Sequence, residues 1–377
     1  MRPADTGHHA SAIFTATVMI RATHKFVVLA GCLLAAGLAG CGKRGVTGTN
    51  DRDVPPVGDA GHLPLMDLGA GTYLGFGGGL YEAGSDSPPA DHASVGAARA
   101  RDVLPRDANG TPAADGKIVL LSIGMSNTSQ EFCGVDVTLN CVAGSFIAQA
   151  MSDPAVNSST LVLVNGAQGG RDAVEWTSAA SRPYDVVRDE RLAAMGVTEQ
   201  QVQVVWLLEA TKRPTASLPA TNADAFALES NLGLIVRALR ARYPNLQQVY
   251  VSDRIYGGYA TTPENPEPYA FETGLAVKWL VQAQIDQMRN GGAVVDSRAG
   301  DLNYNSVAPW IAWGPDMWAN GATPRRDGLT WLPADFKSDG THPSVESGVA
   351  KAGGLLLGFF RTSPTAHCWF LAGRSCS

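Results

Sequence analysis

Three residues in the sequence have the side-chain types that nucleophilic ester hydrolysis requires. Ser126 lies in the stretch Gly124-Met125-Ser126-Asn127, directly after an apolar run, and His342 closes the stretch Asp339-Gly340-Thr341-His342. A serine hydroxyl is a weak nucleophile until a positioned histidine accepts its proton. A carboxylate on the other ring nitrogen fixes the tautomer and stabilises the imidazolium. We therefore predict that Ser126 is the nucleophile, His342 the base and Asp339 the residue that orients His342.

The other histidines fit the role of base less well. Beyond the first 41 residues the chain holds His62, His92, His342 and His367. His367 adjoins Cys368, and His62 borders a Gly- and Pro-containing stretch. His92 follows Asp91 and remains a second choice for the base.

These residues need a framework that brings distant parts of the chain together. Short apolar, β-branched runs predict strands at Lys117–Ile123, Thr160–Val164, Val202–Leu208 and Gln248–Ser252. Helical spacing predicts helices at Ser145–Met151, Tyr184–Met195, Ala223–Tyr243, Phe271–Arg289 and Val345–Phe360. Strands that alternate with helices indicate an α/β fold with a three-layer, doubly wound parallel sheet. Ligands bind at the carboxyl ends of such strands, and Ser126 follows the first of them.

The motifs resemble those of SGNH (GDSL-like) hydrolases, in the form found in sialate O-acetylesterases. The resemblance rests on Gly124–Asn127, on Asn165-Gly166-Ala167-Gln168-Gly169-Gly170 with Trp176 six residues later, and on Asp339–His342. It spans roughly residues 116–360 and implies a flavodoxin-like sheet and a Ser-Asp-His triad. It also implies an oxyanion hole formed by the backbone N–H groups of Ser126 and of Gly169 or Gly170, with Asn127 and Gln168 near the substrate.

The third motif departs from this family. SGNH hydrolases usually carry an amide side chain after the third strand, and this chain has Trp206-Leu207-Leu208-Glu209 there. An ionised Glu209 only accepts hydrogen bonds. Asn165 or Asn127 are the candidates for the missing oxyanion donor. A catalytically degenerate protein that binds carbohydrate or cell-wall material is the alternative function.

Tryptophans are concentrated before the His342 motif, at Trp310, Trp313, Trp318 and Trp331. Trp313 and Trp331 are predicted to form a ring-stacking wall for sugar or aromatic groups. The alternative is that these rings fill the core beneath a long loop.

Composition excludes several classes of function. The 377 residues are 45% hydrophobic and 17% charged, as in a globular protein, which excludes disorder as the main state. A net charge of −6 without a basic stripe makes nucleic acid an improbable partner. No acidic cluster resembles a calcium loop, and we predict neither a metal nor a cofactor.

The N-terminal part has the features of an export signal. An uncharged run from Phe26 to Gly40 ends in Leu38-Ala39-Gly40-Cys41, which resembles the lipobox of bacterial lipoproteins and makes Cys41 the candidate lipidation site. We predict a signal at 1–41, a flexible tether at 42–61, an irregular extension at 62–115 and the hydrolase domain at 116–377. The protein is then exported and anchored to a bacterial membrane through lipid alone.

The remaining cysteines agree with export. They form two local pairs, which favours the disulfides Cys133–Cys141 and Cys368–Cys376 in an oxidising compartment.

Overall fold

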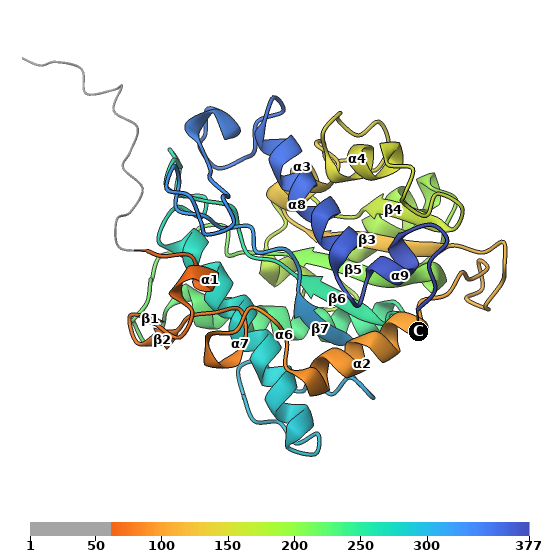
Figure 1. Cartoon of the computed structure of the whole chain (residues 1–377), viewed down its shortest axis with the longest axis horizontal. Coiled ribbons are helices and arrows are strands. Elements are labelled where there is room, and N and C mark those ends of the chain that lie inside the picture. The colour runs from red at the N-terminus through yellow and green to blue at the C-terminus, as the bar shows by residue number, and fades with distance from the viewer. Residues whose placement is uncertain (1–61, 377) are drawn as a thin grey trace, which may run out of the picture. The chain divides into compact units, whose positions relative to one another are not determined.

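The centre of the molecule is a five-stranded parallel sheet (Figure 1). The computed structural model describes residues 62–376. The strands are β3 (Ile118–Gly124), β4 (Leu161–Asn165), β5 (Val202–Leu208), β6 (Gln248–Val251) and β7 (Trp310–Trp313). Their order in the sheet is β4-β3-β5-β6-β7, with every pair parallel. This is the flavodoxin-like order, and the predicted doubly wound fold is confirmed.

Burial explains why the strands are so apolar. Every residue of β3 and β5 is buried, because helices cover both faces of the sheet. On one face, Phe132 stacks on Trp206 of β5, and Tyr250 of β6 packs against Phe359 and Phe360. These phenylalanines belong to α3 (Ser126–Phe132) and α8 (Gly348–Thr362), which also contact each other.

The other long helices form the second cover of the sheet and lie close to their predicted positions. They are α6 (Asp224–Arg242) and α7 (Tyr269–Arg289), which pack against each other. The shorter helices are α1 (Leu65–Leu68), α2 (Ala90–Arg101), α4 (Phe146–Ser152), α5 (Arg182–Val186) with the π-helical turn Val187–Leu192, and α9 (His367–Phe370). A two-stranded hairpin consists of β1 (Thr72–Tyr73) and β2 (Phe76–Gly77), and 3₁₀ turns occupy Glu82–Gly84, Ala173–Trp176, Glu199–Gln201 and Pro333–Asp335.

The edge strand β7 was not predicted from the sequence. Its four residues, Trp310–Trp313, pair with β6, so they belong to the sheet and not to a long loop. The run is shorter than an average strand and is half tryptophan, so it lacks the β-branched signal that marks the other four.

The segment 62–115 is also more regular than predicted. It contains the 12-residue helix α2, whose buried residues are His92, Gly96 and Ala100. These residues recur every four positions, as on one face of a helix, but none is a large apolar side chain, so the hydrophobic pattern is weak. The helix contacts β6 and β7, and His92 Nε2 lies 2.8 Å from the Ile311 carbonyl.

Both predicted disulfides, Cys133–Cys141 and Cys368–Cys376, are present. The first closes a loop directly after α3, and the second closes the C-terminal loop after α9. Among residues 62–376, no helix is both long and apolar enough to cross a membrane.

Candidate active site

Ser126 is held at the end of the central strand β3 by a sharp turn. Gly124 ends the strand with φ +157°, Met125 is extended, and Ser126 is the first residue of α3. A Cβ on Gly124 would lie 2.1 Å from the Leu208 carbonyl oxygen, so glycine lets β3 and β5 meet closely just before the serine. The first hydrogen bond inside α3 is donated by Ser129 to Met125, which leaves the Ser126 N–H outside the helical ladder.

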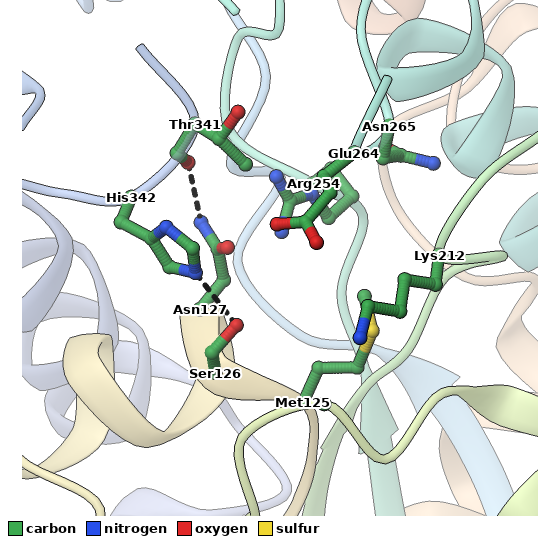
Figure 2. A pocket seen from close by; sticks show the side chains of 10 residues that line it. Met125, Ser126, Asn127, Lys212, Arg254, Glu264, Asn265, Thr341 and His342 are labelled. Atoms are coloured by element: carbon green, nitrogen blue, oxygen red, sulfur yellow. Dashed lines mark hydrogen bonds between the residues drawn. The ribbon is translucent and has the colours of Figure 1, made fainter. Parts of the chain in front are cut away.

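His342 and Asp339 meet Ser126 from the loop that precedes α8. Ser126 Oγ lies 2.7 Å from His342 Nε2 (Figure 2). On the other side of the ring, His342 Nδ1 lies 2.8 Å from Asp339 Oδ2. With the proton on Nδ1, Nε2 is free to accept the serine proton. The three residues therefore form a continuous hydrogen-bonded chain.

Asp339 is fixed by its own loop. Its Oδ1 accepts hydrogen bonds from the backbone N–H groups of Thr341 (2.9 Å) and His342 (3.0 Å). Burial acts to raise the pKa of Asp339, but these N–H groups and the His342 ring outweigh burial and hold that pKa below its ordinary value. Asp339 is therefore ionised at neutral pH, and its carboxylate holds the His342 ring in place through Nδ1.

Ser126 and His342 open into a small pocket at the carboxyl ends of the strands. Its volume is about 250 Å³. The residues that line it are mostly polar or charged: Met125, Ser126, Asn127, Gly170, Lys212, Arg254, Glu264, Asn265, Thr341 and His342. Asn127 also ties the two halves of the site together, because its Nδ2 donates to the Thr341 carbonyl at 2.9 Å (Figure 2).

The predicted oxyanion donors differ in availability. The Ser126 N–H is outside the helical ladder, as described above. Gly169 lies beside Ser126, but its N–H donates to Asp136 Oδ2 at 3.0 Å. Gly170 lines the pocket with φ +76°. Asp136 belongs to the loop closed by Cys133–Cys141, is half exposed, and pairs with Arg191 at 3.4 Å.

Asn165 does not supply an oxyanion donor, so this part of the prediction is wrong. It is fully buried, and its Nδ2 donates to Ser129 Oγ and to the carbonyls of Val135 and Val137. Its Oδ1 accepts from Ser122 Oγ. The side chain is fully used in holding the disulfide loop against the strand ends.

Gln168 is likewise turned away from the pocket. Its Nε2 donates to the Pro183 carbonyl at 2.8 Å, at the start of α5, and the residue is not part of the pocket lining. Instead of contacting a substrate, as predicted, the Gln168 side chain links the loop after β4 to the start of α5.

The predicted tryptophan wall is also absent from this pocket. Trp331 is completely buried and its Nε1 donates to the Met317 carbonyl. Trp313 is 3% exposed and lines a separate cavity of about 710 Å³ next to α2 and α8, not the cavity at Ser126. Both rings belong to the buried core, as the core-filling alternative expects, but Trp313 lies in strand β7 and not beneath a long loop.

Glu209, the residue of the divergent third motif, is buried directly after β5 and does not line the pocket. Burial raises its pKa well above the ordinary value, against a hydrogen bond from the Ala210 N–H that lowers it. Burial therefore disfavours the ionised form of this carboxyl group.

His92, the second choice for the base, has a structural role. It is 4% exposed, stacks on Trp310, and lies outside the pocket. Burial lowers its pKa to about 4, so the ring stays neutral. Of the other histidines, His62 packs against Tyr73 and Phe271, and His367 Nδ1 lies 2.8 Å from the Ser363 carbonyl.

Sequence reasoning missed the charged part of the pocket, which consists of Lys212, Arg254 and Glu264. Lys212 and Arg254 each follow a strand by a few residues, β5 and β6 respectively. The rule that ligands bind at strand ends would have found them if it had been applied to every strand. Cys41 lies outside the described residues.

The sequence matches no family model and no curated protein. Among solved structures, it is similar to an extracellular lipase from Streptomyces rimosus, with 16% identity, 64% of this chain and 99% of that chain covered, and a TM-score of 0.32. It is also similar to a family two carbohydrate esterase from Clostridium thermocellum in complex with cellohexaose. The identity is 15%, the match covers 65% of this chain and 63% of that chain, and the TM-score is 0.33. A carbohydrate esterase family 2 enzyme from Myceliophthora fergusii gives 16% identity, 65% and 66% coverage, and a TM-score of 0.32. Similarity this distant assigns neither an activity nor a substrate to the chain.

Proposed function

We propose that the protein is a serine ester hydrolase of the SGNH type that removes short acyl groups, with O-acetylated carbohydrate as the substrate class. The observation that carries the proposal is the chain Ser126 Oγ, His342 Nε2, His342 Nδ1, Asp339 Oδ2, with contacts of 2.7 and 2.8 Å, which opens into a pocket. The order of the motifs and the flavodoxin-like strand order support the same assignment.

The reaction proceeds in two acyl transfers. Ser126 Oγ attacks the ester carbonyl while His342 Nε2 takes its proton, and Asp339 stabilises the resulting imidazolium. The Ser126 N–H donates to the oxyanion of the tetrahedral intermediate. His342 then returns the proton to the leaving alcohol. A water molecule, activated by His342, hydrolyses the acyl-serine and restores the free site.

The pocket favours a short acyl group. A volume of about 250 Å³ with one fully apolar lining side chain, Met125, offers no channel for a long hydrocarbon chain. The polar lining instead suits an alcohol with several hydroxyl groups, such as a sugar.

A fluorophosphonate probe tests this function directly. Incubation of the purified domain with the probe, followed by peptide mass mapping, should place the adduct on Ser126, and His342→Ala should slow labelling strongly because the base is lost. In parallel, para-nitrophenyl acetate and acetylated sugars are assayed for hydrolysis. No adduct on Ser126 and no hydrolysis of any ester would overturn the proposal.

A carbohydrate-binding protein without turnover is the second candidate. The observation that favours it is the Asp136 carboxylate on the Gly169 N–H, which places a negative charge where one oxyanion donor is expected. Saturable glycan binding by the wild type, without hydrolysis and without a Ser126 adduct, would establish this candidate.

We also propose that the protein is exported and held on a bacterial membrane by a lipid on Cys41. The two disulfides support an oxidising compartment. Cys41→Ser should release the protein from the membrane fraction, and unchanged association of that variant with the membrane would refute the anchor.

A further inference from the structure

Lys212 brings an ammonium group into the active-site pocket. It follows β5 by four residues, is partly exposed, and lines the cavity that contains Ser126 and His342. Its Nζ atom forms neither an ion pair nor a hydrogen bond with any residue between 62 and 376. The ammonium hydrogens are therefore available to a molecule that enters the pocket.

Lys212 lies beside the two glycines of the loop after β4. A Cβ added to Gly170 would lie 3.5 Å from Lys212 Nζ, and a Cβ added to Gly169 would lie 3.9 Å from the Ser126 Cβ. Figure 2 shows Lys212 and His342 reaching into the pocket from opposite sides. Since the leaving alcohol must face His342 to receive its proton, the oxyanion of the tetrahedral intermediate is directed away from His342, toward the side where Lys212 lies.

The other side-chain donors of the pocket lining are engaged or hidden. Asn127 Nδ2 and Asn265 Nδ2 each donate to a backbone carbonyl, at 2.9 and 3.1 Å, and the Thr341 hydroxyl donates to a carbonyl of its own loop. Arg254 is 1% exposed, and its Nε and Nη2 atoms are inaccessible to solvent. Apart from Ser126 and His342, Lys212 is thus the lining residue whose side-chain donors have no acceptor in the described part of the chain and can reach a substrate oxygen.

A positive charge at this place offsets a negative one. The Asp136 carboxylate accepts the Gly169 N–H at 3.0 Å, so it occupies one backbone donor and brings a negative charge close to the developing oxyanion. An ammonium group beside Gly170 opposes that charge. It is also a strong donor, because a hydrogen bond from an ionised group is about twice as strong as one between neutral groups.

We propose that Lys212 is a catalytic residue that donates a hydrogen bond from its ammonium group to the oxyanion, together with the Ser126 N–H. The inference rests on the proposed hydrolase function. As the bond from Ser126 Oγ to the carbonyl carbon forms, the π electrons of the carbonyl move onto its oxygen and His342 Nε2 takes the serine proton. Lys212 keeps its own proton throughout. The carbonyl re-forms as the alcohol leaves with the proton from His342, and the transfer of the acyl group to water passes through a second oxyanion of the same kind.

An uncharged acetyl ester measures this role. For para-nitrophenyl acetate, Lys212→Met should lower kcat by about a hundredfold or more with little change in KM, because an oxyanion donor acts in the transition state. Both acyl transfers use the donor, so kcat falls whichever of them limits the rate. Lys117→Met is the matched control and should leave kcat unchanged, since Lys117 lies at the opposite end of β3 and its Nζ donates to the Ser159 carbonyl at 2.9 Å.

Chemical rescue separates the charge of Lys212 from its shape. Lys212→Cys, treated with 2-bromoethylamine, regains an ammonium group at nearly the length of lysine, and most of the lost kcat should return. The same variant treated with iodoacetamide carries a neutral amide and should stay slow. The wild type treated with each reagent controls for reaction elsewhere in the protein.

The outcomes distinguish this inference from the proposed activity. If the wild type is active, unchanged kcat in Lys212→Met would overturn the role of Lys212 and leave the hydrolase standing. A higher KM at constant kcat would also overturn it, because Lys212 would then bind the substrate without acting on the oxyanion. Loss of kcat that aminoethylation does not restore would assign the residue to the fold instead. A wild type that neither hydrolyses esters nor forms a fluorophosphonate adduct on Ser126 would refute the hydrolase and the role of Lys212 together.

Discussion

Ser126 and His342 act as one hydrogen-bonded unit in the proposed mechanism, so their substitutions should not add. We expect Ser126→Ala and His342→Ala each to lower kcat for a small acetyl ester by at least about a thousandfold, and the double variant to be little worse than either alone. The measurement is steady-state hydrolysis with active-site titration. A double variant far worse than both single variants would show that the two residues contribute independently.

Asp339→Asn tests the third residue of the proposed triad with a substitution that keeps the shape of the side chain. The replacement is nearly isosteric, so the thermal unfolding midpoint should stay close to that of the wild type while kcat falls, because the amide permits the wrong imidazole tautomer. Full activity of this variant would contradict the assigned orientation of His342.

Asp136 places a carboxylate on the Gly169 N–H, at 3.0 Å, and so competes with the oxyanion for that donor. Asp136→Asn removes the charge that disfavours a developing oxyanion, and we expect kcat to rise by about tenfold or more, since one oxyanion donor typically changes kcat by about a hundredfold to a thousandfold. The exposed Asp189→Asn serves as the control for net charge. A fall in kcat for Asp136→Asn would show that the carboxylate is needed in the reaction.

At the scale of the elements, the loop before α8 depends on Gly340. This residue has φ +67°, and a Cβ there would lie 1.8 Å from the Tyr259 carbonyl oxygen. Gly340→Ala should therefore displace the loop that carries Asp339 and His342, lowering both kcat and the free energy of unfolding, the latter by roughly 2 kcal/mol or more.

Gly373→Ala is a matched control for backbone strain. Gly373 has φ +66°, almost the same as Gly340, but no atom lies within 4 Å of its added Cβ. Its effect on stability measures the cost of the positive φ alone, and activity should be retained. Equal loss of stability and activity in both variants would show that the contact with Tyr259 is unimportant.

The sequence was sufficient for the elements whose signal is local. β3 and β5 are apolar runs interrupted by one polar residue each, Ser122 and Gln203, and α6 and α7 have helical spacing, so both their type and their position were predictable. Ser126, Asp339 and His342 were singled out because a serine after a strand and Asp-x-x-His before a helix occur together, and the structure brings the three side chains into contact. The two disulfides followed from the short separation of each pair.

Features that depend on three-dimensional neighbours were not predictable in this way. Asn165 ends β4 as an oxyanion donor would, but its amide is taken by Ser129 and by carbonyls of the disulfide loop. The sequence at Trp331 is the same whether its ring stacks on a sugar or fills the core. Only its contacts in the folded protein distinguish the two roles. Arg254 is ordinary in sequence and becomes unusual only through burial without an acceptor.

At the scale of the whole molecule, the buried acid Glu131 should make stability depend on pH. It is fully buried in α3, and burial raises its pKa from 4.5 to about 7. The folded state therefore holds this proton more tightly than the unfolded chain. The contribution of Glu131 to stability is complete below about pH 4.5 and is lost as the pH rises through about 7.

Glu131→Gln lacks this titration. Between about pH 4 and pH 8, the free energy of unfolding of the wild type should fall relative to that of Glu131→Gln by up to about 3 kcal/mol. Urea unfolding at a series of pH values measures the difference, in which other titrating groups such as His92 cancel because both proteins contain them. For the control substitution Glu190→Gln, at an exposed position, the free energy of unfolding should depend on pH as it does in the wild type. Parallel curves for Glu131→Gln would show that Glu131 keeps its ordinary acidity in the fold.

The hydrogen bond between Ser126 and His342 joins residues 216 positions apart in the chain. Ser126 follows the first strand of the sheet, β3, whereas His342 lies in the loop before α8, near the C-terminal end of the described residues. While the ribosome extends the chain, the serine consequently has no partner to activate it until nearly all of the sequence has been synthesised. In the proposed mechanism, hydrolysis can therefore begin only after the loop that carries His342 has docked, and a chain that stops before this loop should be unreactive toward esters.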